Sequence, residues 1–307
     1  MNILVTGCAG FIGSHFVEEA LGKGHTVVGV DSLTYAGKLS NMNSFQDEIS
    51  FYQFDICDTE AIEKIVSSSN VEWIVNFAAE SHVDNSIKSC DEFVRTNILG
   101  VKSLLEVCRA TSAKMLQIST DEVYGTISFG SFSESDMLNP RNPYSATKAS
   151  AEHLINAYGQ THDVIFKIVR MSNNFGPRQD NEKFLPTVIR SLKNNKRIPV
   201  YGNGSNVRDW LYVKDACRLV DRVLERGENQ QIYNVTYNNE MTNLSLIHEV
   251  TDIMGLDFDS SIQFVEDRPG HDFRYSIDNA YLYHLNIGKP TDFRAALRTT
   301  IKSWSDE

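Results

Sequence analysis

The chain has 307 residues and a formal net charge of -11, from 29 Lys and Arg against 40 Asp and Glu. This length is enough to bury one large core or two fused ones without covalent staples. The acidic balance argues against docking on nucleic acid or an anionic membrane, because both need clustered Lys and Arg.

The cysteines and the first residues of the chain indicate in which cellular compartment the protein is expected. The five cysteines are odd in number, scattered and free of any C-x-x-C pair, which argues against a disulfide framework and against a zinc site, so no metal is expected. The chain enters an apolar stretch at once, without a basic leader, and no apolar run reaches membrane-spanning length. These features predict a cytoplasmic protein.

From residue 2 to about 170, short β-rich runs alternate with helix-like stretches, as in a parallel sheet covered by helices on both faces. The near-continuous apolar character of the runs indicates strands that are buried on both faces. The predicted strands are 2–6, 26–30, 50–54, 73–77, 114–119 and 164–170. The predicted helices are 12–22, 58–69, 91–111 and 144–160.

After residue 171 this alternation weakens, which predicts a smaller, mixed C-terminal lobe that binds substrate. A helix at 214–226 and a strand at 231–235 are expected to return to the first lobe. The expected first lobe therefore comprises 1–170 with returning segments from about 206 to 238. The expected second lobe comprises mainly 171–205 and 239–307.

A glycine-rich segment, Gly7-Cys-Ala-Gly10-Phe-Ile-Gly13, follows the first predicted strand and opens the first helix. In this context it predicts a Rossmann-type, doubly wound α/β fold, with a dinucleotide pyrophosphate at the helix N-terminus; the alternative is a tight turn without ligand. Asp31 ends the second strand, where a carboxylate binds ribose hydroxyls and repels a 2′-phosphate, which favours NAD over NADP. Further expected cofactor contacts are Phe11, Ile12, Asp55, Ile56, Ala78, Ala79, Tyr144 and Lys148.

Acid/base chemistry is predicted by two stretches. The first, Ile-Ser-Thr-Asp-Glu-Val-Tyr-Gly, places Asp121 and Glu122 directly after Thr120 at a strand end, although such a pair can also be an exposed turn or helix cap. In the second, Tyr144 and Lys148 are one helical turn apart and share a helix face. A tyrosine, with a usual pKa near 10, needs a nearby cation to act as a base at neutral pH, and Lys148 can supply it.

Together the glycine loop, the strand-end Ser/Thr and the Tyr-Ser-Ala-Thr-Lys stretch resemble the extended short-chain dehydrogenase/reductases. Within that group the chain resembles the dTDP-glucose 4,6-dehydratases in several segments, in order and across nearly its whole length. These segments are Ser119-Thr-Asp-Glu-Val-Tyr-Gly125, Ala78-Ala-Glu-Ser-His-Val-Asp84, Ser172-Asn-Asn-Phe-Gly-Pro177, Arg208-Asp-Trp-Leu-Tyr-Val213 and Asp267-Arg-Pro-Gly-His-Asp272. The chain departs from the family at Asn85, where Arg is usual, and in a shorter insert before Tyr144.

The resemblance implies an NAD-dependent hydro-lyase of deoxysugar biosynthesis that acts on a nucleotide-linked glucose, with dTDP or UDP as the nucleotide. Tyr144 and NAD together would oxidise the C4 hydroxyl, with Thr120 and Lys148 steering the proton. Glu122 as base and Asp121 as acid would then remove water across C5 and C6. Hydride return to C6 would give the 4-keto-6-deoxy sugar, so NAD would stay tightly bound and be recycled.

Substrate contacts are expected in the second lobe and after the fourth strand, with Arg208 and Arg268 on the pyrophosphate. The full expected set is Ser81, His82, Asn173, Asn174, Glu182, Lys183, Arg208, Arg268 and His271. Trp210 and Phe175 could pack against the base, but aromatic residues in a mixed lobe are more often part of the core.

Helices 91–111 and 144–160 carry apolar residues on more than one face, and family members commonly pair these helices, so a homodimer is expected; the same residues could simply cover the sheet. Two other functions stay open. A nucleotide-sugar 4-epimerase would share the cofactor loop and Tyr144 but need no Asp-Glu pair. A non-catalytic protein that binds NAD or a nucleotide sugar could use the same fold.

Overall fold

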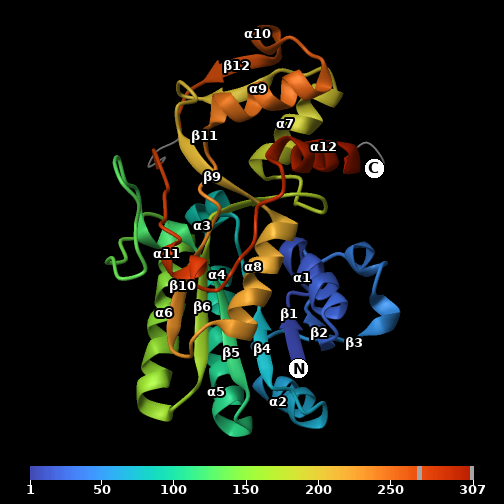
Figure 1. The fold of residues 1–307 in the computed structure, drawn as a ribbon, viewed down its shortest axis with the longest axis vertical. Helices are drawn as coiled ribbons and strands as arrows, with labels where there is room; N and C mark the ends of the chain where they lie inside the picture. The colour runs from blue at the N-terminus through green and yellow to red at the C-terminus, as the bar shows by residue number, and fades with distance from the viewer. Residues whose placement is uncertain (268–271, 305–307) are drawn as a thin grey trace.

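Seven parallel strands form the central sheet in the computed structural model, which describes residues 1–267 and 272–304 (Figure 1). The strand order across the sheet is β10-β6-β5-β4-β1-β2-β3. Their bounds are β1 (Asn2–Thr6), β2 (Thr26–Asp31), β3 (Ser50–Gln53), β4 (Trp73–Asn76), β5 (Lys114–Thr120), β6 (Phe166–Met171) and β10 (Gln231–Val235). Each of the six strands predicted before residue 171 is present, with ends within two residues of the prediction.

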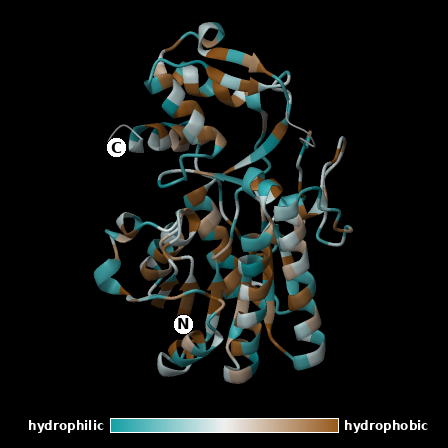
Figure 2. Ribbon diagram, turned by 180° about the vertical axis from the view of Figure 1, so that it is seen from behind, coloured by the Kyte–Doolittle hydropathy of each residue, from teal (hydrophilic) through white to brown (hydrophobic). Residues whose placement is uncertain are grey.

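Helices cover both faces of this sheet, because its strands are apolar on both sides. One hydrophobic cluster contains residues of α1 and α8, and the other contains residues of α2, α5 and α6. These helices are α1 (Phe11–Gly22), α2 (Thr59–Ser68), α5 (Val101–Thr111), α6 (Pro143–His162) and α8 (Val213–Arg226). Figure 2 shows hydrophobic residues along the central strands. The predicted Rossmann-type α/β fold is confirmed.

The segment predicted as one helix at 91–111 is helical throughout but not uniform. It begins as α4 (Asp91–Val94), widens to a π-helical turn, η3 (Arg95–Gly100), and continues as α5. Gly100 lets η3 lie close to the segment after β3, since a Cβ there would lie 2.5 Å from Ile56 Cδ1. Such π turns are frequently found at functional sites.

The second lobe contains a three-stranded sheet, β11-β9-β7, and a two-stranded sheet, β12-β8. Their strands are β7 (Asn173–Phe175), β8 (Ile198–Tyr201), β9 (Val207–Tyr212), β11 (Glu240–Thr242) and β12 (Ile262–Val265). The longer helices of this lobe are α7 (Phe184–Lys193), α9 (Asn243–Met254) and α12 (Phe293–Ser303). In Figure 1 this lobe lies beyond the carboxyl ends of the central strands.

Short helical segments complete the described chain. They are η1 (Leu39–Met42), η2 (Gln46–Glu48), α3 (Val83–Lys88), η4 (Asp121–Tyr124), α10 (Phe258–Ser261) and α11 (Ala280–Tyr283). The helix predicted at 214–226 is α8, and the strand predicted at 231–235 is β10, which pairs with β6 in the central sheet. Among the described residues, no helix combines the length and hydrophobicity that a bilayer crossing requires.

Candidate active site

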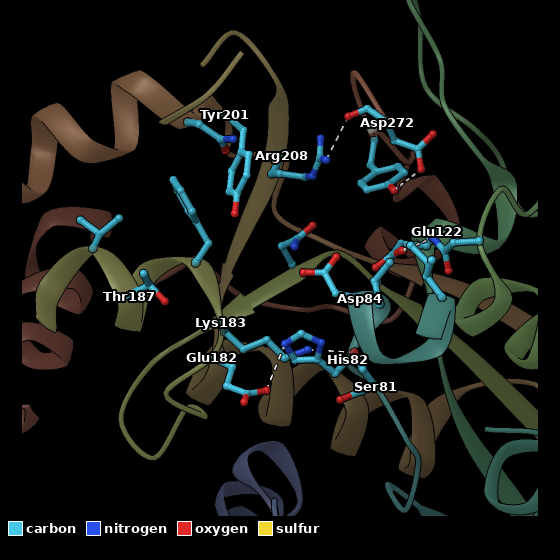
Figure 3. A pocket seen from close by; sticks show the side chains of 18 of the residues that line it. Ser81, His82, Asp84, Glu122, Glu182, Lys183, Thr187, Tyr201, Arg208 and Asp272 are labelled. Carbon is cyan, nitrogen blue, oxygen red and sulfur yellow. Dashed lines mark hydrogen bonds and ion pairs between the residues drawn. The ribbon is translucent and has the colours of Figure 1, made fainter. Parts of the chain in front are cut away.

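A cavity of about 390 Å³ lies between the carboxyl ends of the central strands and the second lobe (Figure 3). In open α/β sheets this edge is the usual place for ligands. The predicted residues that line the cavity are Ser81, His82, Glu122, Asn173, Glu182, Lys183 and Arg208. The structure therefore brings together residues of both lobes that are far apart in the sequence.

The glycine loop beside this cavity has the shape that a pyrophosphate requires. Gly7 has a positive φ of 68°, and a Cβ there would lie 2.7 Å from the backbone nitrogen of Ala78. A Cβ on Gly13 would collide with the carbonyl of Gly7. Gly10 caps α1 without a side-chain hydrogen bond, so the first-turn N–H groups, which include those of Phe11 and Ile12, can meet an anion. The loop fits a dinucleotide.

Asp31 ends β2 as predicted and is 7% exposed. One carboxylate oxygen accepts the backbone N–H of Ala9 at 3.0 Å, and the other accepts that of Leu33 at 2.8 Å. Burial raises the pKa of Asp31, and these two hydrogen bonds oppose the rise. Each oxygen keeps a second lone pair, so the carboxylate can still accept a ribose hydroxyl.

The other predicted cofactor residues lie along the same edge. Asp55 follows β3 and pairs with the Arg95 guanidinium at 2.8 Å. Burial opposes the charge of Asp55, but its hydrogen bonds to Cys57 and Arg95 lower its pKa overall. Ile56 is 4% exposed and packs in the hydrophobic cluster that contains α2 and α5. Ala78 and Ala79 follow β4, in the segment that faces the glycine loop.

Two adjacent carboxylates stand at the end of β5. Thr120 ends the strand and caps η4, its hydroxyl accepting the backbone N–H of Glu122 at 3.3 Å and donating to Asp121 Oδ1 at 3.2 Å. Asp121 is 3% exposed, and its Oδ2 has no hydrogen-bond partner in the described part of the chain. Glu122 Oε2 accepts from the Asn142 amide at 3.1 Å. The pair is therefore held in place and is not an exposed turn.

The surroundings of Asp121 and Glu122 affect the pKa values of the two carboxyl groups differently. Burial raises the pKa of Asp121 well above its usual range, and the carboxylates of Glu122 and Asp209 raise it further. Burial also raises the pKa of Glu122, but the Asn142 amide and the positive charges of Arg208 and Lys183 oppose that rise. Pairs of carboxyl groups whose pKa values are pushed apart are suited to act as acid and base.

Tyr144 and Lys148 lie on the first turns of α6, next to this pair. Asn142, which holds Glu122, also caps α6. Lys148 is 4% exposed and donates to the Ile118 carbonyl at 2.6 Å, and burial lowers its pKa to about 8. The pKa of Tyr144 is raised, because burial and the charge of Glu122 outweigh the Thr120 hydroxyl. The sequence predicted that Lys148 lowers the pKa of Tyr144. In the structure the surrounding residues raise that pKa instead.

One wall of the cavity comes from the loop after β4 and the start of α7. Lys183 donates to the Ser81 carbonyl at 2.8 Å, and His82 Nε2 lies 3.2 Å from Glu182 (Figure 3). Burial lowers the pKa of Lys183, and Glu122 partly opposes this. His82 caps α3, since its Nδ1 accepts the backbone N–H of Asn85 at 3.4 Å, a contact that does not involve the Asn85 side chain.

The opposite wall is built on β9. The Arg208 guanidinium lies 4.4 Å from the centre of the Tyr275 ring and donates to the Asp272 carbonyl at 3.0 Å (Figure 3). Asn173 lines the cavity, whereas Asn174 is not among its lining residues and donates to the Ser172 carbonyl at 2.9 Å.

Of the two predicted aromatic contacts, only Trp210 lines the cavity. Phe175 is 1% exposed and packs edge-on against Trp210 within the core. It is therefore a core residue, which was the alternative to a contact with the base. Arg268 and His271 lie outside the described residues.

Several residues of the site had no place in the sequence predictions. Asn142 precedes Pro143 at the start of a predicted helix, which is the usual place for a capping residue and a signal that could have found it. Asn97, in η3, is 1% exposed and clamps the loop after β4 by bonding the Glu80 backbone at 2.9 and 3.0 Å. Other lining residues without such a signal are Arg141, Tyr201 and Tyr275, whereas Asp84 and Asp272 end two of the family-like segments but were given no role.

Comparison with known proteins gives consistent matches. Residues 4–293 match the family described as GDP-mannose 4,6 dehydratase. The chain is 48% identical to the low-salt glycan biosynthesis protein Agl12 of Haloferax volcanii, over 91% of the chain and 90% of that protein. It is 41% identical to a dTDP-glucose 4,6-dehydratase of Mycobacterium tuberculosis, over 100% of this chain and 94% of that protein.

The structure is also similar to that of DesIV, a dTDP-glucose 4,6-dehydratase from Streptomyces venezuelae that was solved with NAD bound. The TM-score is 0.96 at 38% identity, and the match covers 100% of this chain and 98% of the other.

Proposed function

We propose, since the chain belongs to the dTDP-glucose 4,6-dehydratase family of hydro-lyases, that it converts a nucleoside-diphosphate glucose to the 4-keto-6-deoxy sugar. One observation carries this proposal: Asp121 and Glu122, with their pKa values raised unequally, stand beside Tyr144 and Lys148 in one site. A 4-epimerase would need only the second pair.

NAD fits the glycine loop, where Gly7, Gly10 and Gly13 leave room for it and Asp31 can accept its ribose hydroxyls. When bound, NAD would supply the hydride acceptor for the oxidation at C4 and the hydride donor for the reduction at C6, so it would be recycled without net consumption. The other proposed contacts are those of Phe11, Ile12, Asp55, Ile56, Ala78 and Ala79.

In the oxidation, Tyr144 removes the proton from the C4 hydroxyl. The Thr120 hydroxyl beside it favours the phenolate and so opposes part of the rise in the tyrosine pKa that burial and Glu122 cause. Lys148, fixed on the Ile118 carbonyl, supplies positive charge to the same place while it is protonated. Positioned general bases of this kind typically contribute about 10²- to 10⁴-fold in rate.

In the elimination, the new C4 ketone acidifies the C5 hydrogen. Glu122, whose charged form is favoured by Asn142, Arg208 and Lys183, removes that proton. Asp121 stays protonated to a higher pH, and its unpartnered Oδ2 can donate to the departing C6 hydroxyl. The C5–H and C6–O bonds break, a C5–C6 double bond forms, and water leaves.

The nucleoside diphosphate lies along the second-lobe wall in this proposal. Arg208 is the main pyrophosphate contact, because its guanidinium faces the cavity and can bind phosphate oxygens bidentately. Lys183 and Asn173 complete the polar lining near the sugar. The remaining proposed substrate residues are Ser81, His82, Asn174, Glu182, Arg268 and His271.

In this proposal residues 1–170, with 206–238, bind the cofactor, and the remaining residues mainly bind the substrate. A homodimer is also proposed, through the outer faces of α4 to α6. Val94 and Leu99 are 39% and 54% exposed on that face, and a partner would cover them. Light scattering at micromolar concentration tests this, and a monomer would contradict it. The free state of all five cysteines is compatible with the proposed cytoplasmic location.

Mass spectrometry of the sugar nucleotide tests the proposed reaction. The purified protein is incubated separately with dTDP-glucose and UDP-glucose, and loss of one water is measured. Loss from one donor supports the dehydratase and names the nucleotide. Unchanged mass, with galactose in the hydrolysate, would instead support the 4-epimerase. No change with either donor would contradict both reactions.

A further inference from the structure

Arg170, in β6, is the centre of a buried polar network behind the candidate site. It is 3% exposed, and its Nε and Nη2 donate to the Glu152 carboxylate at 3.0 and 2.6 Å. Its Nη1 donates to the Tyr124 hydroxyl at 2.5 Å. Tyr124 in turn donates to Asn234 Oδ1, in β10, at 2.8 Å. One guanidinium therefore contacts α6 and η4 at the same time.

On the α6 side, the network lies one helical turn beyond Lys148. Glu152 is 1% exposed and also accepts from the Ser119 hydroxyl at 2.5 Å. Ser119 is the neighbour of Ile118, whose carbonyl accepts from Lys148. Two consecutive turns of α6 are thus hydrogen-bonded to two consecutive residues of β5. These contacts fix the position of Lys148 relative to β5 and, through the helix, that of Tyr144.

On the η4 side, the network holds the turn that carries the carboxyl pair. Tyr124 lies two residues after Glu122 and is 1% exposed. Its ring is stacked on Phe132, with centroids 5.0 Å apart and an interplanar angle of 9°, and the Arg170 guanidinium lies 4.6 Å from the ring centre. Tyr124 therefore anchors Asp121 and Glu122 against β6.

A buried ion pair of this kind is not explained by stability alone. Removing two charges from water can cost as much as their attraction returns, so such pairs are weak evidence for stability. The proposed reaction, however, needs the C4 hydroxyl at Tyr144 and the C5 hydrogen at Glu122 in a single sugar pose. A misplacement of about 1 Å can cost on the order of 100-fold in rate.

The geometry points to Glu152, Arg170 and Tyr124 as positioning residues that hold the oxidising pair, Tyr144 with Lys148, in register with the eliminating pair on η4. This inference rests on the proposed function. It assigns the two arms of the network to different steps: Glu152 serves the oxidation, and Tyr124 serves the elimination.

The test separates the two steps in a single turnover of the holoenzyme with the donor that the unmodified protein accepts. Formation of reduced nicotinamide is followed by absorbance, and loss of water is followed by mass spectrometry. Glu152→Gln should slow reduction by about 10- to 100-fold, with no build-up of the reduced form, since elimination then keeps pace. Tyr124→Phe should leave reduction within about threefold but let the reduced form accumulate, because elimination slows by about 10- to 100-fold.

Tyr158→Phe is the matched control, since it removes a phenol from the same helix α6 whose partner, Glu106 at 2.6 Å, lies away from the site. Both of its steps should match those of the unmodified protein. Hydrogen exchange gives a second readout that does not depend on activity. Glu152→Gln should speed exchange at the start of α6, and Tyr124→Phe should speed it at residues 121–124.

If both variants slow both steps equally, or if neither slows any step, the positioning role is wrong. Equal loss of exchange protection across the sheet would likewise show a merely structural network. Failure of the unmodified protein to reduce NAD with any donor would instead overturn the proposed function, and the positioning role with it.

Discussion

The carboxyl edge of the central sheet and the second-lobe wall of the cavity are built differently. At the sheet edge, functional groups are buried and each is held by a neighbouring element, as Asn142 holds Glu122 and Ile118 holds Lys148. At the second-lobe wall, Glu182 contacts His82 of the loop after β4, and the Glu182 side chain is 59% exposed. In the proposed function, the chemistry would therefore use the buried, hydrogen-bonded groups, where small errors in geometry are costly, and recognition of the nucleotide would use the more solvated wall.

The strongest test of this difference between the two regions is the variant Tyr144→Phe at the sheet edge. Without the phenolic hydroxyl, reduction of NAD by the substrate should fall by about 10²- to 10⁴-fold, because Tyr144 is the proposed base for the C4 proton. Stopped-flow absorbance measures the loss. The variant should still bind NAD, which calorimetry checks. A variant that still reduced NAD normally would show that another residue is the base.

Glu122→Gln should affect the second step almost as strongly. Reduced nicotinamide should form and then persist, because removal of the C5 proton slows by about 10²- to 10⁴-fold. Asp121→Asn should slow elimination less completely, since water can protonate the leaving hydroxyl. Quenched samples analysed by mass spectrometry report the water loss. Normal turnover by Glu122→Gln would rule out Glu122 as the base.

On the second-lobe wall the effect should be smaller and of another kind. Arg208→Met should raise KM for the sugar nucleotide by about 10- to 100-fold, the value of hydrogen bonds to a charged group, with kcat within a few-fold. Arg197→Met, at an exposed position before β8 in the same lobe, is the control and should leave KM unchanged. A fall in kcat alone would place Arg208 in the chemistry and remove the contrast between the two regions.

The smallest effect should be a gain of stability. Because the folded state raises the pKa of Asp121, it binds more protons than the unfolded state above about pH 4, and its stability falls as pH rises through that window. Asp121→Asn removes this cost and should stabilise the protein by about 1–3 kcal/mol at pH 7. Urea unfolding at pH 5 and pH 8 should show a larger gain at the higher pH. A variant less stable at both values would contradict the burial argument.

The sequence predicted the central sheet well, because strands that are buried on both faces leave continuous apolar runs between turns. It did not predict η3, since a π-helical turn changes the helix width without changing which residues are apolar. Tyr144, Lys148, Asp121 and Glu122 could be found because each pair is close in sequence. Tyr201 and Tyr275 could not, because only the folding of distant segments brings them to the cavity.

The place of β10 in the sheet has a consequence for how the protein is made. β10 pairs with β6, although β7 to α8 lie between them in the chain. A nascent chain that has emerged only as far as α8 already carries the glycine loop and both acid/base pairs. It still lacks Asn234, the acceptor for Tyr124. Domains commonly fold as the chain leaves the ribosome, so this edge of the sheet is completed late in synthesis.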